Sequence, residues 1–175
     1  MKNILEDFLS LGKLEEGLIV IRKESITADQ CIADVQTVVE EMEQLLKPGQ
    51  KINLEYSGNR NLILERNLVK NILLNLTSNA IKFSPENSII EVTINFKENE
   101  LEISVKDKGI GISEEDQQHL FKRFFRGRNV TNIQGSGLGL HIVGKYLELL
   151  NGKIEIKSSL NNGSAFLITI PSNEN

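Results

Sequence analysis

Hydrophobic positions along the 175-residue chain follow a helical period in some stretches and alternate with polar positions in others. The first stretch, residues 2–16, carries apolar side chains over so wide a stripe that we predict a helix packed against a partner. Gly17 is expected to end this helix, because glycine readily adopts the left-handed conformation that follows many helices. Residues 18–21 are mostly apolar and are a candidate for a short strand.

Three further helices are predicted from the same period. Residues 27–30 read as a capping box, in which the first and last side chains bond to each other's backbone, and the helix that they open stops at residues 47–49. The next helix begins near residue 65 and continues to about residue 83. The last helix, residues 138–150, is apolar nearly all round, so we expect it to be well buried.

Alternating apolar and polar positions predict strands in the remaining segments. Residues 90–96 and 101–105 alternate on either side of a turn, which indicates a hairpin, and a second hairpin surrounds the turn at residues 161–163. Shorter strands are plausible at residues 52–56 and 62–64. Strands with one polar face belong to a sheet that helices cover on the other side only. The sequence therefore predicts a two-layer α+β sandwich with a mixed, mostly antiparallel sheet and helices on one face.

Composition narrows the classes of function. A net charge of −4 gives no general attraction for nucleic acid, and aromatic side chains are too few for base-stacking platforms. The one cysteine, Cys31, excludes an internal disulfide framework, and we interpret it as a small apolar residue on a helix. No apolar run approaches the roughly 20 residues of a membrane span, and no signal peptide opens the sequence. We expect a reduced, cytoplasmic segment without membrane contact, built as one domain with a short appendage.

The helix over residues 65–83 carries polar side chains where a purely structural helix has little use for them. Asn75, Asn79 and Lys82 are spaced i, i+4 and i+7, so two carboxamides and an ammonium project from neighbouring turns beside the apolar face. A buried amide without a hydrogen-bond partner costs about 1–3 kcal/mol. A bound ion or phosphate would supply such partners, which is the first indication of a nucleotide.

A second polar group lies where a predicted strand ends. Asp107 is followed by Gly109 and Gly111. A carboxylate in this position can accept hydrogen bonds from a flat, amino-bearing ring, and glycines allow the backbone to come close. The same pattern also marks ordinary turns, so both interpretations are open from this motif alone.

A third motif, Gly135 to Leu140, comes directly before the buried helix and contains three glycines. Glycines at a helix start let backbone N–H groups point at an anion, which the helix dipole also favours. A P-loop is excluded because no Gly-Lys-Ser/Thr follows, and Leu140 occupies the position of the third glycine of a dinucleotide-binding fingerprint. A phosphate cradle and a glycine hinge are equally compatible with the motif.

Between the second and third motifs lies a segment, residues 120–126, with three phenylalanines, followed by a polar loop at 127–134. The phenylalanines are explained by a small local core. A polar loop beside a phosphate site also fits a mobile lid, from which Arg126 or Arg128 would reach a phosphate.

The order of these motifs on a helix, a strand end and a helix start resembles the N, G1, F and G2 boxes of the ATP-binding domain of sensor histidine kinases. This domain belongs to the wider family shared with gyrase, MutL and heat-shock-chaperone ATPases. The resemblance covers about residues 25–171, so we predict an ATP-binding catalytic domain over 25–175. Residues 4–15 resemble the end of the second helix of the dimerisation hairpin in these kinases, and we assign residues 1–24 to a remnant of that hairpin and its connector.

The resemblance implies roles for individual residues. Asn79 would bind Mg²⁺ through its side-chain oxygen, and Lys82 would neutralise phosphate charge. Asn75 occupies the position where related ATPases carry a glutamate that activates water. An amide cannot serve as a strong base, which fits transfer of phosphate to a protein rather than hydrolysis. Asn75 and Lys82 are therefore the candidate catalytic residues.

The resemblance also outlines an ATP site. Asp107 would bind the adenine amino group, Phe83 would flank the nucleotide, and Arg126 with the backbone of residues 135–140 would face the phosphates. The candidate ATP-binding residues are Asn75, Asn79, Lys82, Phe83, Asp107, Gly109, Gly111, Phe125, Arg126, Gln134, Gly135, Ser136, Gly137, Leu138, Gly139, Leu140 and, in the last strand, Thr169.

These kinases phosphorylate a histidine at the start of the first hairpin helix, in a His-Glu/Asp motif followed by a proline. The chain has only His119 and His141, neither in such a motif, so we expect both to be structural or exposed. The resemblance implies ATP and Mg²⁺ as cofactors. It also implies two partners. The first is the phosphoacceptor hairpin of a homodimeric parent kinase, for which a membrane anchor is left open. The second is the receiver domain of a response regulator, which takes the phosphoryl group on an aspartate.

Two alternatives share the fold. One is a serine kinase of the anti-sigma type. The phenylalanines of residues 120–126 and the hairpin remnant argue against this alternative. The other is a nucleotide-sensing module without transfer activity, which the three intact nucleotide motifs disfavour.

Overall fold

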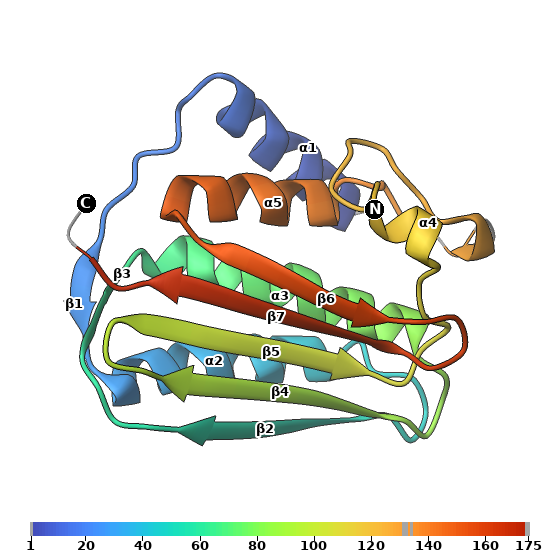
Figure 1. Ribbon diagram of the computed structural model, residues 1–175, viewed down its shortest axis with the longest axis horizontal. Helices are drawn as coiled ribbons and strands as arrows, with labels where there is room; N and C mark the ends of the chain where they lie inside the picture. The colour runs from blue at the N-terminus through green and yellow to red at the C-terminus, as the bar shows by residue number, and fades with distance from the viewer. Residues whose placement is uncertain (1, 131–132, 134, 174–175) are drawn as a thin grey trace.

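The computed structural model describes residues 2–130, 133 and 135–173, and it confirms the predicted two-layer α+β sandwich (Figure 1). The helices are α1 (Lys2–Glu15), α2 (Ala28–Glu43), α3 (Arg66–Phe83), α4 (Glu114–Gln117), the 3₁₀ helix η1 (Arg128–Val130) and α5 (Gly139–Leu150). The strands are β1 (Glu24–Ile26), β2 (Lys51–Ser57), β3 (Leu62–Leu64), β4 (Ile89–Phe96), β5 (Glu100–Asp107), β6 (Lys153–Ser158) and β7 (Ser164–Pro171). In the described part of the chain no helix combines the length and the apolarity needed to cross a membrane.

The main sheet has five strands in the order β2-β4-β5-β7-β6 (Figure 1). Only β2 and β4 pair in parallel, and the two predicted hairpins, β4–β5 and β6–β7, are antiparallel. Ile103 lies at the centre, opposite Ile94 on one side and Ile168 on the other, and all three side chains are buried. Cross-strand pairs of buried β-branched residues fix this register, because a shift by one residue would turn them all to solvent.

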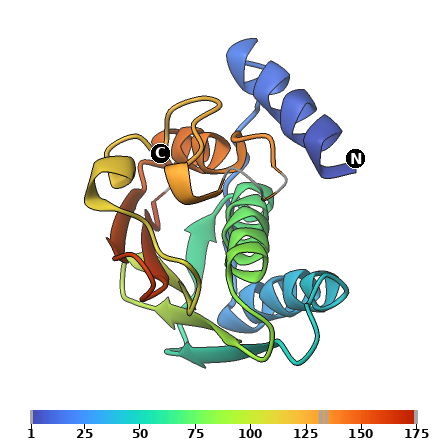
Figure 2. The same cartoon turned by 90° about the vertical axis from the view of Figure 1, so that its right-hand side faces the viewer.

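Helices α2, α3 and α5 cover one face of the sheet, as Figure 2 shows edge-on. Their apolar faces and the inward positions of the strands form one core. Helix α1 lies outside this layer and packs on α5, where Leu11 is inserted into the core with 2% of its surface exposed (Figure 2). The predicted partner of the first helix is therefore within the chain.

Both ends of α3 are held by side chains. Glu65 caps the start by accepting a hydrogen bond from the Leu68 N–H. At the other end Gln50 Nε2 donates to Ile81 O at 3.1 Å, and Lys47 Nζ donates to Lys82 O at 2.8 Å. Carbonyls at a helix end lack partners within the helix, so these donors satisfy them and fix the last turn in position.

One predicted element differs from the structure. The candidate strand at residues 18–21 is wrong: this segment has no regular structure, and the strand β1 begins three residues later, where it pairs with β3. A strand requires a partner, and β3 offers one only to residues 24–26. In its described residues, the long connection from β5 to α5 contains the short helices α4 and η1.

Candidate functional site

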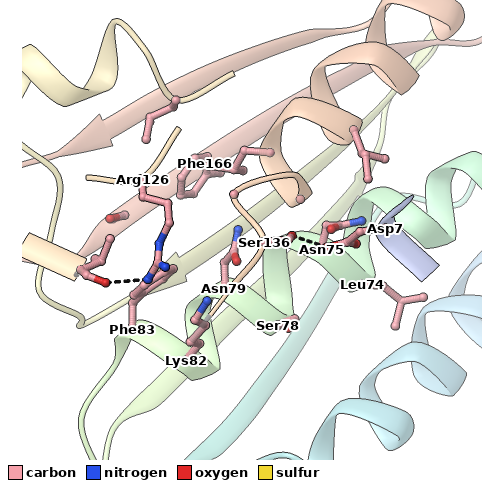
Figure 3. Close-up of a pocket in the computed structure, with 18 of the residues that line it drawn as sticks. Asp7, Leu74, Asn75, Ser78, Asn79, Lys82, Phe83, Arg126, Ser136 and Phe166 are labelled. Carbon is pink, nitrogen blue, oxygen red and sulfur yellow. Dashed lines mark hydrogen bonds between the residues drawn. The ribbon is translucent and has the colours of Figure 1, made fainter. Parts of the chain in front are cut away.

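A cavity of about 810 Å³ lies between α3, α5, the middle of α1 and the connection from β5 to α5 (Figure 3). Its volume is within the range of about 300–1,000 Å³ that is usual for small-molecule sites. Most of the predicted site residues line it, namely Asn75, Asn79, Lys82, Phe83, Asp107, Gly111, Phe125, Arg126, Gly135, Ser136, Gly137, Gly139 and Leu140. The fold thus brings together the three motifs that the sequence spreads over more than sixty residues.

The exposed side of α3 forms one wall of the cavity. Asn75 and Asn79 point into it from successive turns, as their spacing predicts (Figure 3). Asn75 Nδ2 donates to Asn71 O at 2.9 Å, which directs its Oδ1 toward the start of α5. At Gly139 a Cβ would lie only 2.9 Å from this oxygen. Among the described residues, none makes a hydrogen bond to the Asn79 carboxamide, which leaves its oxygen available to a ligand.

Lys82 is half-buried in the same wall. Its Nζ lies 4.9 Å from the centre of the Phe83 ring and next to Gly135, where any Cβ would collide with it. Burial lowers the pKa of Lys82 below its ordinary value, the Arg126 guanidinium lowers it further, and the Asp7 carboxylate opposes this change. A bound anion would offset both the desolvation and the repulsion between the two cations.

Asp107 lines the cavity from the last position of β5. It is 7% exposed, and its Oδ1 accepts a hydrogen bond from the Gly109 N–H at 2.7 Å. Burial raises the pKa of Asp107 above its ordinary value, although backbone hydrogen bonds from Gly109 and Ser164 oppose this. Gly109 does not line the cavity itself, but a Cβ there would lie 2.6 Å from Phe83 O, so it permits the close approach of these two segments.

The start of α5 faces the Asn-bearing wall. Gly137 has a φ of +71°, which lets the chain turn sharply into the helix. No side chain in the described part of the chain caps α5, so its first backbone N–H groups point toward the cavity. The Leu138 side chain is fully buried in the core, and its N–H donates to Ser136 Oγ at 3.2 Å. Leu138 therefore contributes to the shape of the turn and not to the cavity wall.

The connection from β5 to α5 closes the cavity on the third side. Phe125 lines it and stacks edge-on against His119, with ring centres 5.7 Å apart. Arg126 also lines it, but its Nη2 donates to Val130 O at 2.9 Å and to Ile133 O, within its own loop. The predicted candidate Gln134 lies outside the described residues.

Arg128, the second cation proposed to reach a phosphate, is directed elsewhere. It forms an ion pair with Glu115 at 2.8 Å and is not among the residues that line the cavity.

Thr169, like Gly109 and Leu138, is not among the residues that line the cavity. Strand β7 alternates, and Ser164, Phe166 and Ile168 face the helices, so Thr169 projects from the opposite face of the sheet. The residues of β7 that do line the cavity are Ser164 and Phe166, and Ser164 pairs with Asp107 in the β5–β7 register. The alternation from Phe166 backward would have indicated Ser164 from the sequence.

Sequence reasoning also missed Asp7 and Ser10 of α1, which line the cavity near the start of α5. They reach the cavity only because α1 packs on the domain, and the local sequence pattern does not predict this packing.

Comparisons with known proteins identify relatives of the chain. The profile of the family described as "Histidine kinase-, DNA gyrase B-, and HSP90-like ATPase" matches residues 65–174. The sensor-like histidine kinase SenX3 of Mycobacterium tuberculosis is 34% identical over 145 residues, which cover 79% of this chain and 35% of SenX3. The adaptive-response sensory kinase SasA of Prochlorococcus marinus is 35% identical, over 98% of this chain and 47% of SasA. The chain thus spans about a third to a half of the length of these relatives.

Solved structures agree with the fold. The catalytic domain of histidine kinase ThkA superposes with a TM-score of 0.70 and 28% identity, covering 86% of this chain and 96% of that domain. Full-length ShkA superposes with a TM-score of 0.80 over 98% of this chain and 36% of its own, at 23% identity, which is a likeness of fold alone. The chain therefore belongs to the family of histidine kinase-, DNA gyrase B- and HSP90-like ATPases, and residues 65–174 form an ATP-binding catalytic domain of the sensor histidine kinase type.

Proposed function

We propose that the cavity binds ATP with Mg²⁺ and transfers the γ-phosphoryl group to a histidine on a separate dimerisation hairpin, for relay to an aspartate of a response regulator. The observation that carries this proposal is one cavity lined by two chemically different sets of side chains. Asp107 lines it from the end of β5, and we assign it to the adenine end of the site; Asn75, Asn79 and Lys82 line it from α3, and we assign them, with the start of α5, to the phosphate end.

The Asp107 end fits an adenine ring. A carboxylate has about four acceptor positions, and backbone N–H groups use only part of them, so an exocyclic amino group can be bound. Phe166 and Ile110 supply apolar surface beside this position. A guanine ring presents a carbonyl oxygen where adenine has its amino group, so this end favours adenine.

The other end fits a chain of phosphates. Lys82 supplies a desolvated positive charge, and the first N–H groups of α5 supply donors that are aligned with the helix dipole. Arg126 would join them once its hydrogen bonds to the loop carbonyls are exchanged for a phosphate oxygen.

The residues present also fit a Mg²⁺ ion that is bound mainly through phosphate. In the described part of the chain there is no cluster of three or more acidic, histidine or cysteine side chains, but Asn79 offers a neutral oxygen at the phosphate end. Mg²⁺ retains several waters and needs few protein ligands when phosphates coordinate it. When bound, the ion would neutralise charge on the phosphates.

Transfer to a protein is favoured over hydrolysis by the chemistry of Asn75. Its Nδ2 is tied to Asn71 O, and a carboxamide does not take a proton from water. The side chain would instead orient the phosphates, so that the acceptor nitrogen attacks the γ-phosphorus in line as the bond to ADP breaks.

The acceptor is expected on another element. His141 Nδ1 lies 2.8 Å from Phe121 O, His119 packs on Phe125, and neither histidine lines the cavity. Helix α1 exposes Leu5, at 64%, and Leu9, at 57%, as a helix of a dimerisation hairpin would before it meets its partner. This supports the assignment of residues 1–24 to the hairpin and its connector, and it speaks against the serine-kinase alternative.

A calorimetric titration with ATP, ADP and GTP, each with and without Mg²⁺, tests the binding site. We expect ATP to bind more tightly with Mg²⁺, and GTP to bind much more weakly than ATP. Equal binding of GTP and ATP would contradict the assignment of Asp107.

Incubation with γ-labelled ATP and a purified phosphoacceptor hairpin from a related kinase tests the transfer. We expect an acid-labile, alkali-stable label on the hairpin, as a phosphohistidine would give, and no label when the Asn79→Ala variant replaces the chain. Tight ATP binding without any label on the hairpin, on repetition with several hairpins, would favour a nucleotide-sensing module.

A further inference from the structure

We propose that α1 acts as a latch on the loop before α5, and that the phosphates of a bound nucleotide compete with α1 for the start of that helix. The proposal rests on the proposed function and adds to it a means of regulating the same site. It is carried by contacts that join α1 to Arg123, Phe124 and Ser136.

The first contact is between α1 and the glycine-rich turn. Ser136 Oγ donates to Asp7 Oδ2 at 2.6 Å, and both residues line the cavity (Figure 3). The same Ser136 Oγ accepts the Leu138 N–H, so the carboxylate is linked through one hydroxyl to the start of α5. The Asp7 charge also acts on Lys82, whose pKa it raises against the larger effects of burial and Arg126. A carboxylate therefore lies where the positive groups of the site would hold phosphate.

The second contact involves a strained residue of the loop. Phe124 has a φ of +59°, a conformation that bulky side chains seldom adopt, and its ring is 52% exposed. This ring packs against Phe8 of α1, with centres 6.3 Å apart, and against the Arg123 guanidinium at 5.0 Å. Strained conformations persist when surrounding contacts hold them. We infer that Phe8 helps to hold Phe124 in this conformation.

Phe124 is in turn packed on the glycine-rich turn. At Gly137 a Cβ would lie 2.9 Å from the Phe124 carbonyl carbon and 3.0 Å from Phe125 O. The two backbones are therefore in close contact, and we infer that a change in the conformation of Phe124 displaces Gly137. The contacts of Asp7 and of Phe8 thus act on the same turn from two sides.

Helix α1 is held on the domain by a small number of contacts. Leu11 is buried, and Ser10 lies close enough to Tyr146 of α5 to lower the pKa of its hydroxyl, against the larger effect of burial. A further ion pair joins Glu15 to Arg123 at 2.6 Å, but both side chains are about half exposed, and such pairs contribute little to stability. Phosphate binding would repel the Asp7 carboxylate and satisfy the donors that it now faces, so binding would favour undocking of α1.

Docking of α1 and binding of the phosphates oppose each other reciprocally, so a change that weakens docking strengthens binding of the phosphates, at most by the factor by which docking now weakens it. The removal of the charge by Asp7→Asn, or of the ring by Phe8→Ala, is expected to tighten binding of Mg-ATP at least about fivefold, at the low end of the range for coupled sites. Adenosine has no phosphates, so its affinity should stay unchanged. The matched controls are Glu16→Gln, which removes an exposed charge after the end of α1, and Leu9→Ala, which removes an exposed apolar side chain.

Amide hydrogen exchange in the unmodified chain provides a second measurement. Saturating Mg-ATP should accelerate exchange of the α1 amides from Phe8 to Glu15, whereas adenosine should not. The latch is refuted if both variants bind Mg-ATP as the unmodified chain does, or if ATP leaves exchange in α1 unchanged or slows it. Tighter binding by Asp7→Asn alone, without faster exchange in α1, also refutes it, since a purely local charge effect would explain that result.

These outcomes are separate from those for the proposed function. If neither the unmodified chain nor any variant binds ATP, the nucleotide site itself is wrong. If all bind ATP equally and α1 stays protected, only the latch is wrong.

Discussion

The substitution Asp107→Asn tests the adenine end of the cavity with the smallest change of shape. It replaces one carboxylate oxygen by an amide nitrogen, while the remaining oxygen can still accept the Gly109 N–H that now lies 2.7 Å from Oδ1. The new amide donor would then face the adenine amino group, which is a donor as well. Loss of a hydrogen bond to a charged acceptor costs about 1.5–3 kcal/mol, and each 1.4 kcal/mol is a factor of ten, so ATP affinity should fall about 10- to 100-fold.

The same substitution should not lower the stability of the nucleotide-free chain, although it weakens ATP binding. Burial raises the folded-state pKa of Asp107, so the folded chain binds more protons than the unfolded chain in the pH window above the ordinary carboxyl pKa. The free energy of unfolding therefore falls as pH rises through this window, and the deficit is complete at neutral pH. Because Asp107→Asn carries no charge, its Tm at neutral pH should equal or exceed that of the unmodified chain, and this difference should disappear in acid.

Calorimetry with ATP and with tripolyphosphate, together with thermal unfolding at several pH values, measures both effects. Tripolyphosphate lacks the base, so its affinity should not change. The reasoning fails if Asp107→Asn keeps full ATP affinity, or if it weakens tripolyphosphate as much as ATP.

Three further substitutions, one of them with a control at Thr169, probe other parts of the site and its support. Asn79→Ala should remove the Mg²⁺ dependence of ATP binding in calorimetry while adenosine still binds, because the side-chain oxygen at the phosphate end is lost; full Mg²⁺ dependence would exclude Asn79 as a ligand. Gly139→Ala would bring a Cβ within 2.9 Å of Asn75 Oδ1 and should weaken ATP binding at least about tenfold, whereas Thr169→Ala, on the far face of the sheet, should leave the dissociation constant unchanged. Gln50→Leu removes the donor to Ile81 O and to two further carbonyls after α3, so denaturant unfolding should show a loss of about 1–3 kcal/mol, and no loss would contradict the role given to Gln50.

The sequence predicted the parts of the fold that depend on local periodicity. The Thr27–Gln30 capping box is present in both directions, and α3 begins one residue after the predicted Glu65. The i, i+4, i+7 spacing placed Asn75, Asn79 and Lys82 on one side of that helix, because helical geometry alone decides which side chains share a face.

Features that depend on distant partners were not predictable in this way. The strand β1 forms where β3 can pair with it, and not at the more apolar residues 18–21. Thr169 was chosen by resemblance, although the alternation that predicted Phe166 and Ile168 on the inner face already assigned it to the outer face. Asp7 enters the site only because α1 packs on α5, and nothing in the sequence around it indicates this.

A crystal structure with Mg²⁺ and a non-hydrolysable ATP analogue tests the central claim most directly. We predict the adenine amino group within hydrogen-bond distance of the Asp107 carboxylate, the phosphates between Lys82 and the backbone of residues 135–140, and the Asn79 oxygen on the metal ion. A nucleotide bound outside this cavity, or one with its phosphates at Asp107, would contradict the account.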